Sequence, residues 1–340
     1  MDRALLVEIA TDCSPGTFVR LGAGLLDRMR SDPRPRLLLA DLSGEAILLG
    51  RHQRAASVLD RQSWERSGLP VYRRPGGGRA LVAGKGRLGL YLALPRADAI
   101  LDSLIPADRV INRHVRGLLA GLTRAGAASG AHYFGRDFVS SESRQLARLS
   151  QDGLAEGPVL FEAVIGVTES LELPAALRGY PVHSDPRADG PPPVTLEELW
   201  QEPRPISAVM EAIVAGYEKT YGLRAERASD ATEPVDFGPP VWEDEEGFET
   251  SGVADIPIGF AEALLRHADD RVVEVRFRGD FIAPAFVVRA LEEELVGLPL
   301  AFTPLGERVD AIFRREGAGI LGVRGLRIFP DAVLAAAGKL

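Results

Sequence analysis

Apolar residues along the chain recur with the two-residue period of strands in some segments and the three-to-four-residue period of helices in others. The predicted strands cover residues 5–10, 36–42, 45–50, 69–74, 79–84, 88–94, 132–141, 144–150 and 159–167. The predicted helices cover residues 18–29, 56–68, 109–126 and 207–221, and another begins at Thr195. Short strands joined by tight turns, with helices between groups of strands, predict an α+β fold with a mixed sheet.

Turn and cap residues sharpen three of these predictions. A Ser43-Gly44 turn predicts that strands 36–42 and 45–50 pair with each other. Gly68 is a typical C-terminal stop for the helix before it. Thr195 and Glu198 have capping-box spacing, which predicts a helix N-terminus at Thr195.

The composition of the chain changes after the predicted strand at 159–167. Residues 178–194 are rich in Pro, Gly, Asp and Arg, which predicts a long exposed loop. Farther on, a strand over 271–281 and a helix over 283–297 predict a second, smaller unit. We therefore predict a large domain over residues 1–228, an acidic, Pro-rich linker over 229–250 and a small domain over 251–340.

Charge and cysteine usage exclude some classes of function. The formal net charge is -8, which disfavours nucleic acid as the main partner. Cys13 is the one cysteine, so an internal disulfide is excluded and a reducing compartment is favoured. The first residues are too polar for a signal peptide, and no apolar run is long enough to span a membrane. We expect a cytoplasmic protein that binds neither nucleic acid nor membrane.

The segment RRPGGGRALVAGKG, which starts at Arg73, carries the clearest chemistry in the sequence. Glycines allow backbone N–H groups to approach a ligand closely, and arginine offers a planar donor fork that suits phosphate. A glycine-rich hairpin with solvated arginines is the alternative interpretation, because a short glycine motif is weak evidence by itself.

Several segments together resemble the lipoate–protein ligase family and its relatives, the octanoyltransferases and biotin–protein ligases. The segments are ILLGRHQ (47–53), RRPGGGRA (73–80), GRDFV (135–139), SRQLARLSQ (143–151), VVEVRFRGDF (272–281) and ALEEELVGLPL (290–300). They occur in the family's order and cover most of the chain. The resemblance implies a biotin/lipoate protein ligase-like catalytic domain, with a mixed β-sheet flanked by helices, and a small α+β C-terminal accessory domain.

The resemblance also implies which residues surround an acyl-adenylate. In the family the arginine pair and the glycine loop close over this ligand. The positions that match are Arg51, Arg73, Arg74, Gly76, Gly77, Gly78, Arg79, Ala83, Gly135 and Arg136. Arg79 stands where the ligases often have a third glycine.

Two positions depart from the family pattern. Ala83 stands where family members typically have a histidine, and Gln145 stands where they have a lysine that contacts the acyl carboxyl and the phosphate. Glutamine brings no charge, and loss of one preorganised electrostatic donor typically costs on the order of 10²–10³ in rate. The lysines of the chain are Lys85, Lys219 and Lys339, so Lys85 in the glycine-rich segment is the candidate substitute, with a solvated turn lysine as the alternative.

Two functions remain open at the level of sequence. The first is an enzyme that activates lipoate, or a medium-chain acid, with ATP and Mg²⁺ and transfers it to a lysine of a lipoyl carrier domain. The second is a catalytically inactive relative that binds lipoyl or acyl groups, a carrier or a partner protein. The altered Ala83 and Gln145 positions favour the second function, and the retained loops and accessory domain favour the first. No protein metal-ligand cluster is evident, and octanoyl transfer without ATP is weakened because Cys13 lies far from the motifs.

Overall fold

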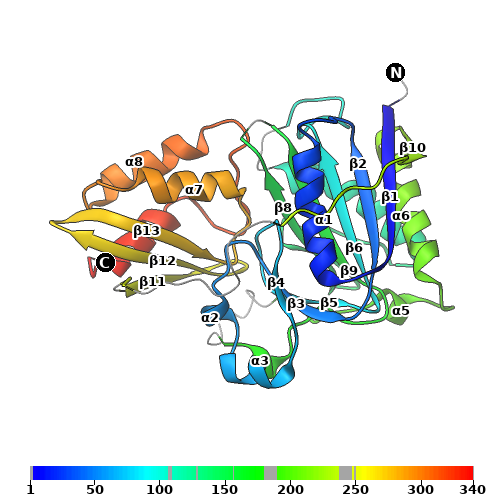
Figure 1. Cartoon of the computed structure of the whole chain (residues 1–340), viewed down its shortest axis with the longest axis horizontal. Helices are drawn as coiled ribbons and strands as arrows, with labels where there is room; N and C mark the ends of the chain where they lie inside the picture. The colour runs from blue at the N-terminus through cyan, green and yellow to red at the C-terminus, as the bar shows by residue number, and fades with distance from the viewer. Residues whose placement is uncertain are drawn as a thin grey trace.

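A computed structural model describes residues 3–105, 109–127, 129–155, 157–179, 190–236, 247–248 and 250–339. Figure 1 shows a large sheet with its helices on one side of the molecule and a smaller unit, made by the C-terminal part of the chain, on the other. Within the described helices, no segment combines the length and the apolarity that a membrane span requires.

The large sheet has seven strands among the described residues, in the order β10-β1-β2-β6-β9-β8-β7. These strands are β1 (Arg3–Cys13), β2 (Arg36–Leu42), β6 (Arg87–Leu94), β7 (Phe138–Ser141), β8 (Arg144–Gly153), β9 (Val159–Gly166) and β10 (Leu223–Arg227). The first three strands in this order run parallel, and from β2 onward each pair is antiparallel. The predicted mixed sheet is therefore confirmed.

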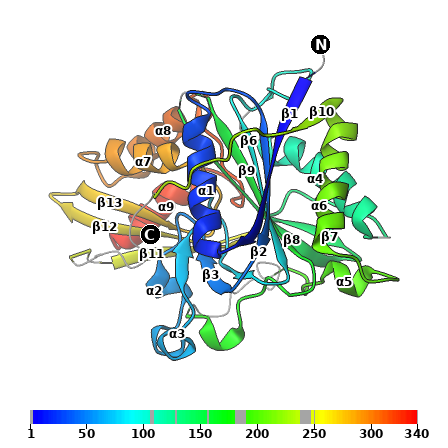
Figure 2. The ribbon, with the colours of Figure 1, turned by 45° about the vertical axis from the view of Figure 1, so that its right-hand side comes forward.

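Three long helices cover the two faces of this sheet. They are α1 (Pro15–Arg28), α4 (Val110–Ala125) and α6 (Ile206–Tyr221). Figure 2 shows α1 on one face and α4 with α6 on the other. Ser14 caps α1 by accepting a hydrogen bond from the Thr17 N–H, and α1 then joins the parallel strands β1 and β2. Each helix lies close to its predicted position.

Beside the large sheet lies a small three-stranded sheet in the order β4-β3-β5. Its strands are β3 (Glu45–Leu49), β4 (Val71–Arg73) and β5 (Leu81–Gly84). The prediction that strands 36–42 and 45–50 pair with each other is wrong, because β2 pairs with β1 and β6 whereas β3 pairs with β4 and β5. The turn at Ser43-Gly44 carries the chain from one sheet to the other.

The single helix predicted over residues 56–68 is two helices, α2 (Ala55–Val58) and α3 (Arg61–Ser67). Leu59 interrupts them with an extended backbone, and the Asp60 side chain begins α3 by accepting from the Ser63 N–H. The predicted stop is confirmed, since Gly68 ends α3 with a φ of 66°. The capping box at Thr195 is also confirmed and begins the short helix α5 (Leu196–Leu199).

The C-terminal unit has more elements than the sequence predicts. In this unit a three-stranded antiparallel sheet packs against three helices. The short 3-10 helix η2 (Ala175–Leu177) lies earlier in the chain, after β9, and is not part of this unit. The elements of this unit are β11 (Thr250–Ile256), β12 (Gly259–Ala268), β13 (Arg271–Gly279), α7 (Ala285–Glu294), α8 (Phe302–Phe313) and α9 (Ile328–Ala336). The predicted strand and helix correspond to β13 and α7.

The predicted linker is described in part. Residues 229–236 run back across the large unit, where the Thr232 backbone N–H donates to Glu8 at 2.8 Å and the Val235 N–H donates to Arg20 O at 3.1 Å. Most of the rest of the predicted linker, and residues 180–189 of the predicted loop, lie outside the described residues. The domain boundaries stay a prediction.

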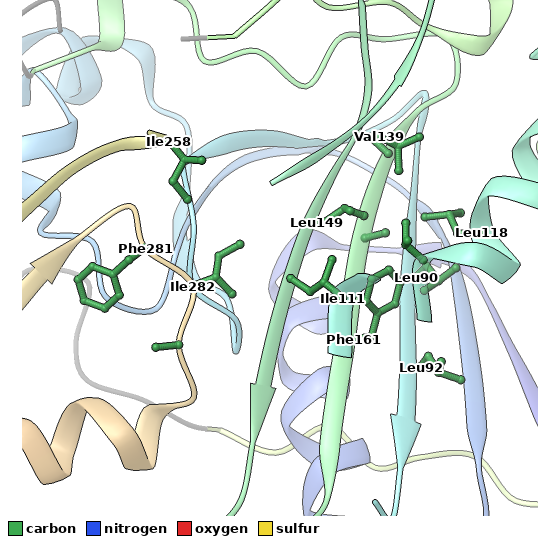
Figure 3. Close-up of a cluster of buried hydrophobic side chains, with 14 of the residues drawn as sticks. Leu90, Leu92, Ile111, Leu118, Val139, Leu149, Phe161, Ile258, Phe281 and Ile282 are labelled. Atoms are coloured by element: carbon green, nitrogen blue, oxygen red, sulfur yellow. The ribbon is translucent and has the colours of Figure 1, made fainter. Parts of the chain in front are cut away.

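Apolar side chains form a core between the large sheet and α4. Figure 3 shows Leu90, Leu92 and Phe161 on neighbouring strands, with Ile111 and Leu118 of α4 beside them. The same cluster continues to Phe281 and Ile282 of the C-terminal unit, which Figure 3 shows beyond β8. A core shared by both units holds the C-terminal unit against the loops that carry the candidate site.

Candidate functional site

The glycine loop, residues 75–78, joins β4 to β5 and lies directly on β8. A Cβ atom at Gly76 would clash with the Ser150 hydroxyl, and the same hydroxyl donates to Gly77 O at 2.8 Å. Only glycine allows this close approach of the backbone to β8. The loop therefore has a structural reason for its composition that is independent of any ligand.

The other side of the glycine loop faces the C-terminal unit. The Gly78 N–H donates to Phe281 O at 3.1 Å, and a Cβ atom at Gly77 would lie 2.5 Å from the same oxygen. The loop is thus held between β8 and the Phe281–Ile282 segment, whose side chains are labelled in Figure 3. Among the backbone N–H groups of this loop, that of Gly78 donates to Phe281 O and that of Gly76 donates to the Glu162 carboxylate.

Arg73 serves the backbone of the neighbouring GRHQ loop, residues 50–53. Its guanidinium Nη1 donates to Gly50 O at 3.3 Å, to Arg51 O at 3.0 Å and to Gln53 O. Buried backbone carbonyl oxygens need hydrogen-bond donors, and the buried Arg73 side chain supplies the donors for these three oxygens. This arginine therefore organises a loop.

Arg74 forms a buried ion pair with a residue that the sequence analysis does not select. Its Nη1 lies 3.2 Å from Glu162 Oε1, and its Nη2 donates to Arg79 O at 2.8 Å. Both side chains of the pair are 1% exposed. Burial raises the pKa of Glu162 above its ordinary value, although Arg74 opposes that shift. The one signal in the sequence is an acidic residue inside the otherwise apolar strand VLFEAVIG.

The GRHQ loop docks on the C-terminal unit. His52 stacks on Phe281 with ring centroids 5.2 Å apart, and its Nε2 lies 2.8 Å from Ala283 O. The Gln53 amide donates to Asp280, and Arg51 lies 3.5 Å from Asp152. Burial lowers the pKa of His52 to about 3, so the ring is neutral at pH 7 and its Nε2–H donates to Ala283 O.

Arg79, the last residue of the RRPGGGR segment, has different surroundings. Its Nε and Nη2 donate to the two carboxylate oxygens of Asp137 at 2.8 and 2.9 Å. Arg148 Nη1 donates to the same carboxylate at 3.0 Å. Burial raises the pKa of Asp137, but the Arg79 and Arg148 guanidiniums outweigh burial and hold that pKa well below its usual range.

A cavity of about 240 Å³ brings Arg79, Gln145 and Arg148 together. Its described lining consists of Arg79, Ala80, Gln145, Ala147, Arg148, Leu171, Glu172, Leu173, Arg178, Gly190, Pro191, Pro192 and Pro193. The Gln145 side-chain amide donates to Pro191 O, and the Gln145 backbone N–H donates to Pro192 O at 2.8 Å. The position implied for the family lysine thus lies on a cavity wall, as a neutral amide.

Four other predicted residues do not line this cavity. Ala83 is fully buried in the apolar cluster that includes Phe18 and Tyr91. Lys85 is exposed in the turn between β5 and β6. Gly135 lies in an exposed turn with a φ of 77°, and the Arg136 guanidinium lies 5.6 Å from the ring centroid of Phe138.

Cys13 is an inert thiol in this fold. It is buried, and burial, with a smaller effect of Asp12, raises its pKa to about 11. Because the thiolate is the reactive form, this position disfavours a cysteine nucleophile. Among the described residues, no group of three His, Cys, Asp or Glu side chains could hold a metal ion.

Residues 20–134 match the family model of the lipoyl protein ligase A/B catalytic domain. This part of the chain is therefore similar to the catalytic domain of that family. The matched region contains the GRHQ loop and the glycine loop and ends before Gln145. No curated protein matches the chain significantly.

Solved lipoate–protein ligases share the fold. P. falciparum LipL1 in complex with lipoate aligns with a TM-score of 0.66 and 11% identity, over 92% of this chain and 95% of that one. A bi-partite lipoate protein ligase from Thermoplasma acidophilum aligns with a TM-score of 0.51 and 15% identity, over 67% and 86%. Lipoate-protein ligase A bound with ATP aligns with a TM-score of 0.51 and 15% identity, over 68% of this chain and 91% of that one. At these identities the likeness shows the fold, and the residues of this chain decide the chemistry.

The structure divides the predicted site into two groups. Arg79 and Gln145 meet at the cavity, whereas Arg73, Arg74 and the glycines build the loops behind it. The sequence analysis selected neither Arg148, which lines the cavity, nor Asp137, which pairs with both Arg79 and Arg148. Asp137 stands inside the GRDFV segment, so its place in a family-like motif was the signal available.

Proposed function

We propose that the protein attaches lipoate, or a medium-chain acyl group, through an acyl-adenylate to a lysine of a lipoyl carrier domain. The observation that carries the proposal is the cavity at which Arg79, Gln145 and Arg148 meet in a chain with the lipoate–protein ligase fold. Support for the ligand classes comes from solved proteins of this fold, one in complex with lipoate, one bound with ATP and one studied with its E2 lipoyl domain.

The described cavity suits part of this ligand set. Guanidinium groups fit carboxylate and phosphate oxygens, so Arg79 and Arg148 would hold the anionic groups of the substrates. ATP with Mg²⁺ would supply the activation of the acyl carboxylate. At about 240 Å³ the cavity is smaller than the roughly 300–1,000 Å³ of pockets for drug-sized ligands, so its described walls fit an acyl group rather than a whole acyl-adenylate. The lone cysteine supports a cytoplasmic location, which is part of the proposal.

The second candidate function is that of a catalytically inactive relative that binds lipoyl or acyl groups, or a carrier or partner protein. Gln145 favours it, because this side chain is neutral and its amide donates to Pro191 O. Lys85 does not offset this, since it lies in an exposed turn and is absent from the described cavity lining. Ala83 also favours this function, because it is buried among apolar side chains at the position where the resemblance implies a histidine.

One experiment separates the two functions. The protein is incubated with lipoate, MgATP and a purified lipoyl domain, and the carrier is read by intact mass spectrometry, with Gln145→Lys as the parallel variant. Carrier modification by the wild type supports the ligase. Modification by the variant alone supports the inactive relative. If neither modifies the carrier, calorimetry with lipoate and with the carrier follows, and binding of neither overturns the ligase and the binding of lipoyl groups or of the carrier.

A further inference from the structure

We propose that a groove on the C-terminal unit binds a basic amphipathic helix of a partner protein. This groove, the α8 groove, has a volume of about 320 Å³. One wall is a face of α8 over residues 302–310, and the other is formed by residues 326–330 at the start of α9. None of the lining residues belongs to the cavity of the candidate site, so the inference stands independently of the proposed function.

The α8 groove is elongated. On α8 its lining residues lie at positions 302 and 303, 306 and 307, and 309 and 310, the three-to-four-residue spacing that keeps side chains on one helix face. Figure 1 shows α8 along one edge of the C-terminal unit. Two helical turns extend about 11 Å, so a segment laid along α8 fits the groove better than a compact ligand does. An amphipathic helix that places its apolar face in a groove binds in this way.

The apolar part of the α8 groove is partly open to solvent. Val309 and Pro330 are buried beneath it, whereas the Phe302 ring is 42% exposed. The Arg327 guanidinium lies 4.8 Å from the centroid of this ring and pairs with Asp331 at 2.9 Å, so the ring is held at one end of the groove. Exposed apolar surface in a concave position is typical of an interaction site.

Gly306 leaves the α8 backbone accessible from the groove. Glycine in a helix interior is about 1 kcal/mol less favourable than alanine. A Cβ atom at Gly306 would meet Phe302 at 3.7 Å, an ordinary contact distance, so packing among the described residues does not require glycine here. Gly76, by contrast, is required by its contact with Ser150. The absence of a side chain at Gly306 allows a partner helix to approach α8 closely.

The charge at the rim of the α8 groove selects a basic partner. Within the described part of the chain, the Glu307 and Asp310 carboxylates have no ion-pair partner. The neighbouring Arg308 pairs with Glu294, and Arg314 donates to the backbone oxygen of Asp310. Carboxylates beside an apolar groove complement lysine or arginine residues that flank the apolar face of a helix.

The test uses two labelled peptides of about five helical turns. One has leucine on one helix face and lysine on the other, and its counterpart has glutamate in place of lysine. Fluorescence anisotropy at physiological ionic strength measures the binding of both peptides to the full chain. The wild type should bind the lysine peptide at least about tenfold more tightly than the glutamate peptide.

The variants separate the shape of the groove from its charge. Gly306→Leu fills the groove at constant charge and should weaken lysine-peptide binding at least about tenfold, while thermal unfolding shows no loss of stability, because leucine favours a helix and has room. Glu307→Gln with Asp310→Asn should weaken binding roughly three- to tenfold. The matched control, Glu202→Gln with Glu211→Gln, removes the same charge from exposed positions of the large unit and should match the wild type.

Four results overturn the inference. Three are the absence of lysine-peptide binding by the wild type, equal binding of the two peptides, and equal binding by the wild type and Gly306→Leu. The fourth is equal weakening by the groove pair and the control pair, because net charge rather than the groove would then attract the peptide. Sedimentation velocity tests the other occupant. A wild type that self-associates where Gly306→Leu is monomeric assigns the groove to a second copy of this chain and also overturns the partner helix.

Discussion

Arg74 and Arg79 stand five residues apart in one loop, yet their guanidiniums have different surroundings. Arg74 pairs with Glu162 beneath the loop and donates to a backbone carbonyl. Arg79 pairs with Asp137 and lines a cavity that Gln145 and Arg148 also line. The comparison teaches that a shared motif does not give its residues a shared role. The strand that a side chain meets across the fold decides whether it supports the loop or faces a ligand.

The same division separates two surfaces of the fold. The supporting side comprises Arg73, Arg74, the glycine loop and His52, and it is covered by β8 and by the C-terminal unit. The cavity side is lined by charged and apolar side chains. Changes on the supporting side should cost stability, and changes on the cavity side should cost ligand binding.

The largest expected effect is that of Arg74→Ala. This change leaves the Glu162 carboxyl buried without its ion-pair partner, and breaking a buried pair costs about 3–5 kcal/mol of unfolding free energy. Urea unfolding measures it. Arg74→Met combined with Glu162→Leu removes both charges and should recover much of the loss. The exposed pair of Arg61 and Glu65 supplies the control, since Arg61→Ala should cost less than about 1 kcal/mol. Equal costs for Arg74→Ala and Arg61→Ala would show that Arg74 does not support the loop.

Acid should act on the supporting side through His52. Unfolded histidine takes up a proton near pH 6.5, whereas folded His52 has a pKa of about 3, so the unfolded state binds more protons between these values. Stability is therefore full above pH 6.5 and falls as the pH falls, by about 2 kcal/mol between pH 6.5 and pH 5 for each such histidine.

The pH slope can be assigned by substitution. His114 is also buried, and burial lowers its pKa to about 4, so it contributes a similar slope. His52→Gln should reduce the pH dependence measured by urea unfolding, and His52→Gln combined with His114→Gln should reduce it further. An unchanged slope in His52→Gln would mean that the interface with Phe281 and Ala283 does not keep this ring neutral.

Gly76→Ala tests the close approach of the loop to β8. The added Cβ clashes with the Ser150 hydroxyl, and overpacking of this kind costs about 1–3 kcal/mol. Gly306→Ala in α8 is a matched control, because its Cβ would meet nothing nearer than 3.7 Å and alanine favours a helix. Thermal unfolding should show a lower midpoint for the first variant and an equal or higher one for the second. Equal midpoints would remove the packing argument for glycine in the loop.

The smallest expected effect is that of Lys85→Ala. Lys85 is an exposed turn residue outside the described cavity lining, so the change should alter stability by less than about 0.5 kcal/mol and leave octanoate binding unaltered. Calorimetric titration with octanoate measures the binding. A loss of binding in Lys85→Ala would show that this lysine contacts the ligand.

Most of the elements were predictable because their signals are local. The apolar period of α4, the stop at Gly68 and the capping box at Thr195 each depend on residues within one or two turns of each other. Strand pairing was less predictable. The turn at Ser43-Gly44 predicts a hairpin, but β2 and β3 find their partners in different sheets. A turn fixes the path of a few residues, whereas pairing depends on strands far away in sequence.

The sequence alone determined the α+β class, the mixed sheet, the positions of the main helices and the likeness to lipoate–protein ligases. It also predicted that Gln145, a neutral residue, stands at the position of the family's lysine. Tertiary structure decided the roles of the arginines. Arg74 meets Glu162 across 88 residues and Arg79 meets Asp137 across 58, so neither partner can be read from local pattern. Those pairings follow from the order and register of the strands, because sheet packing decides which charges are buried together and which line a cavity.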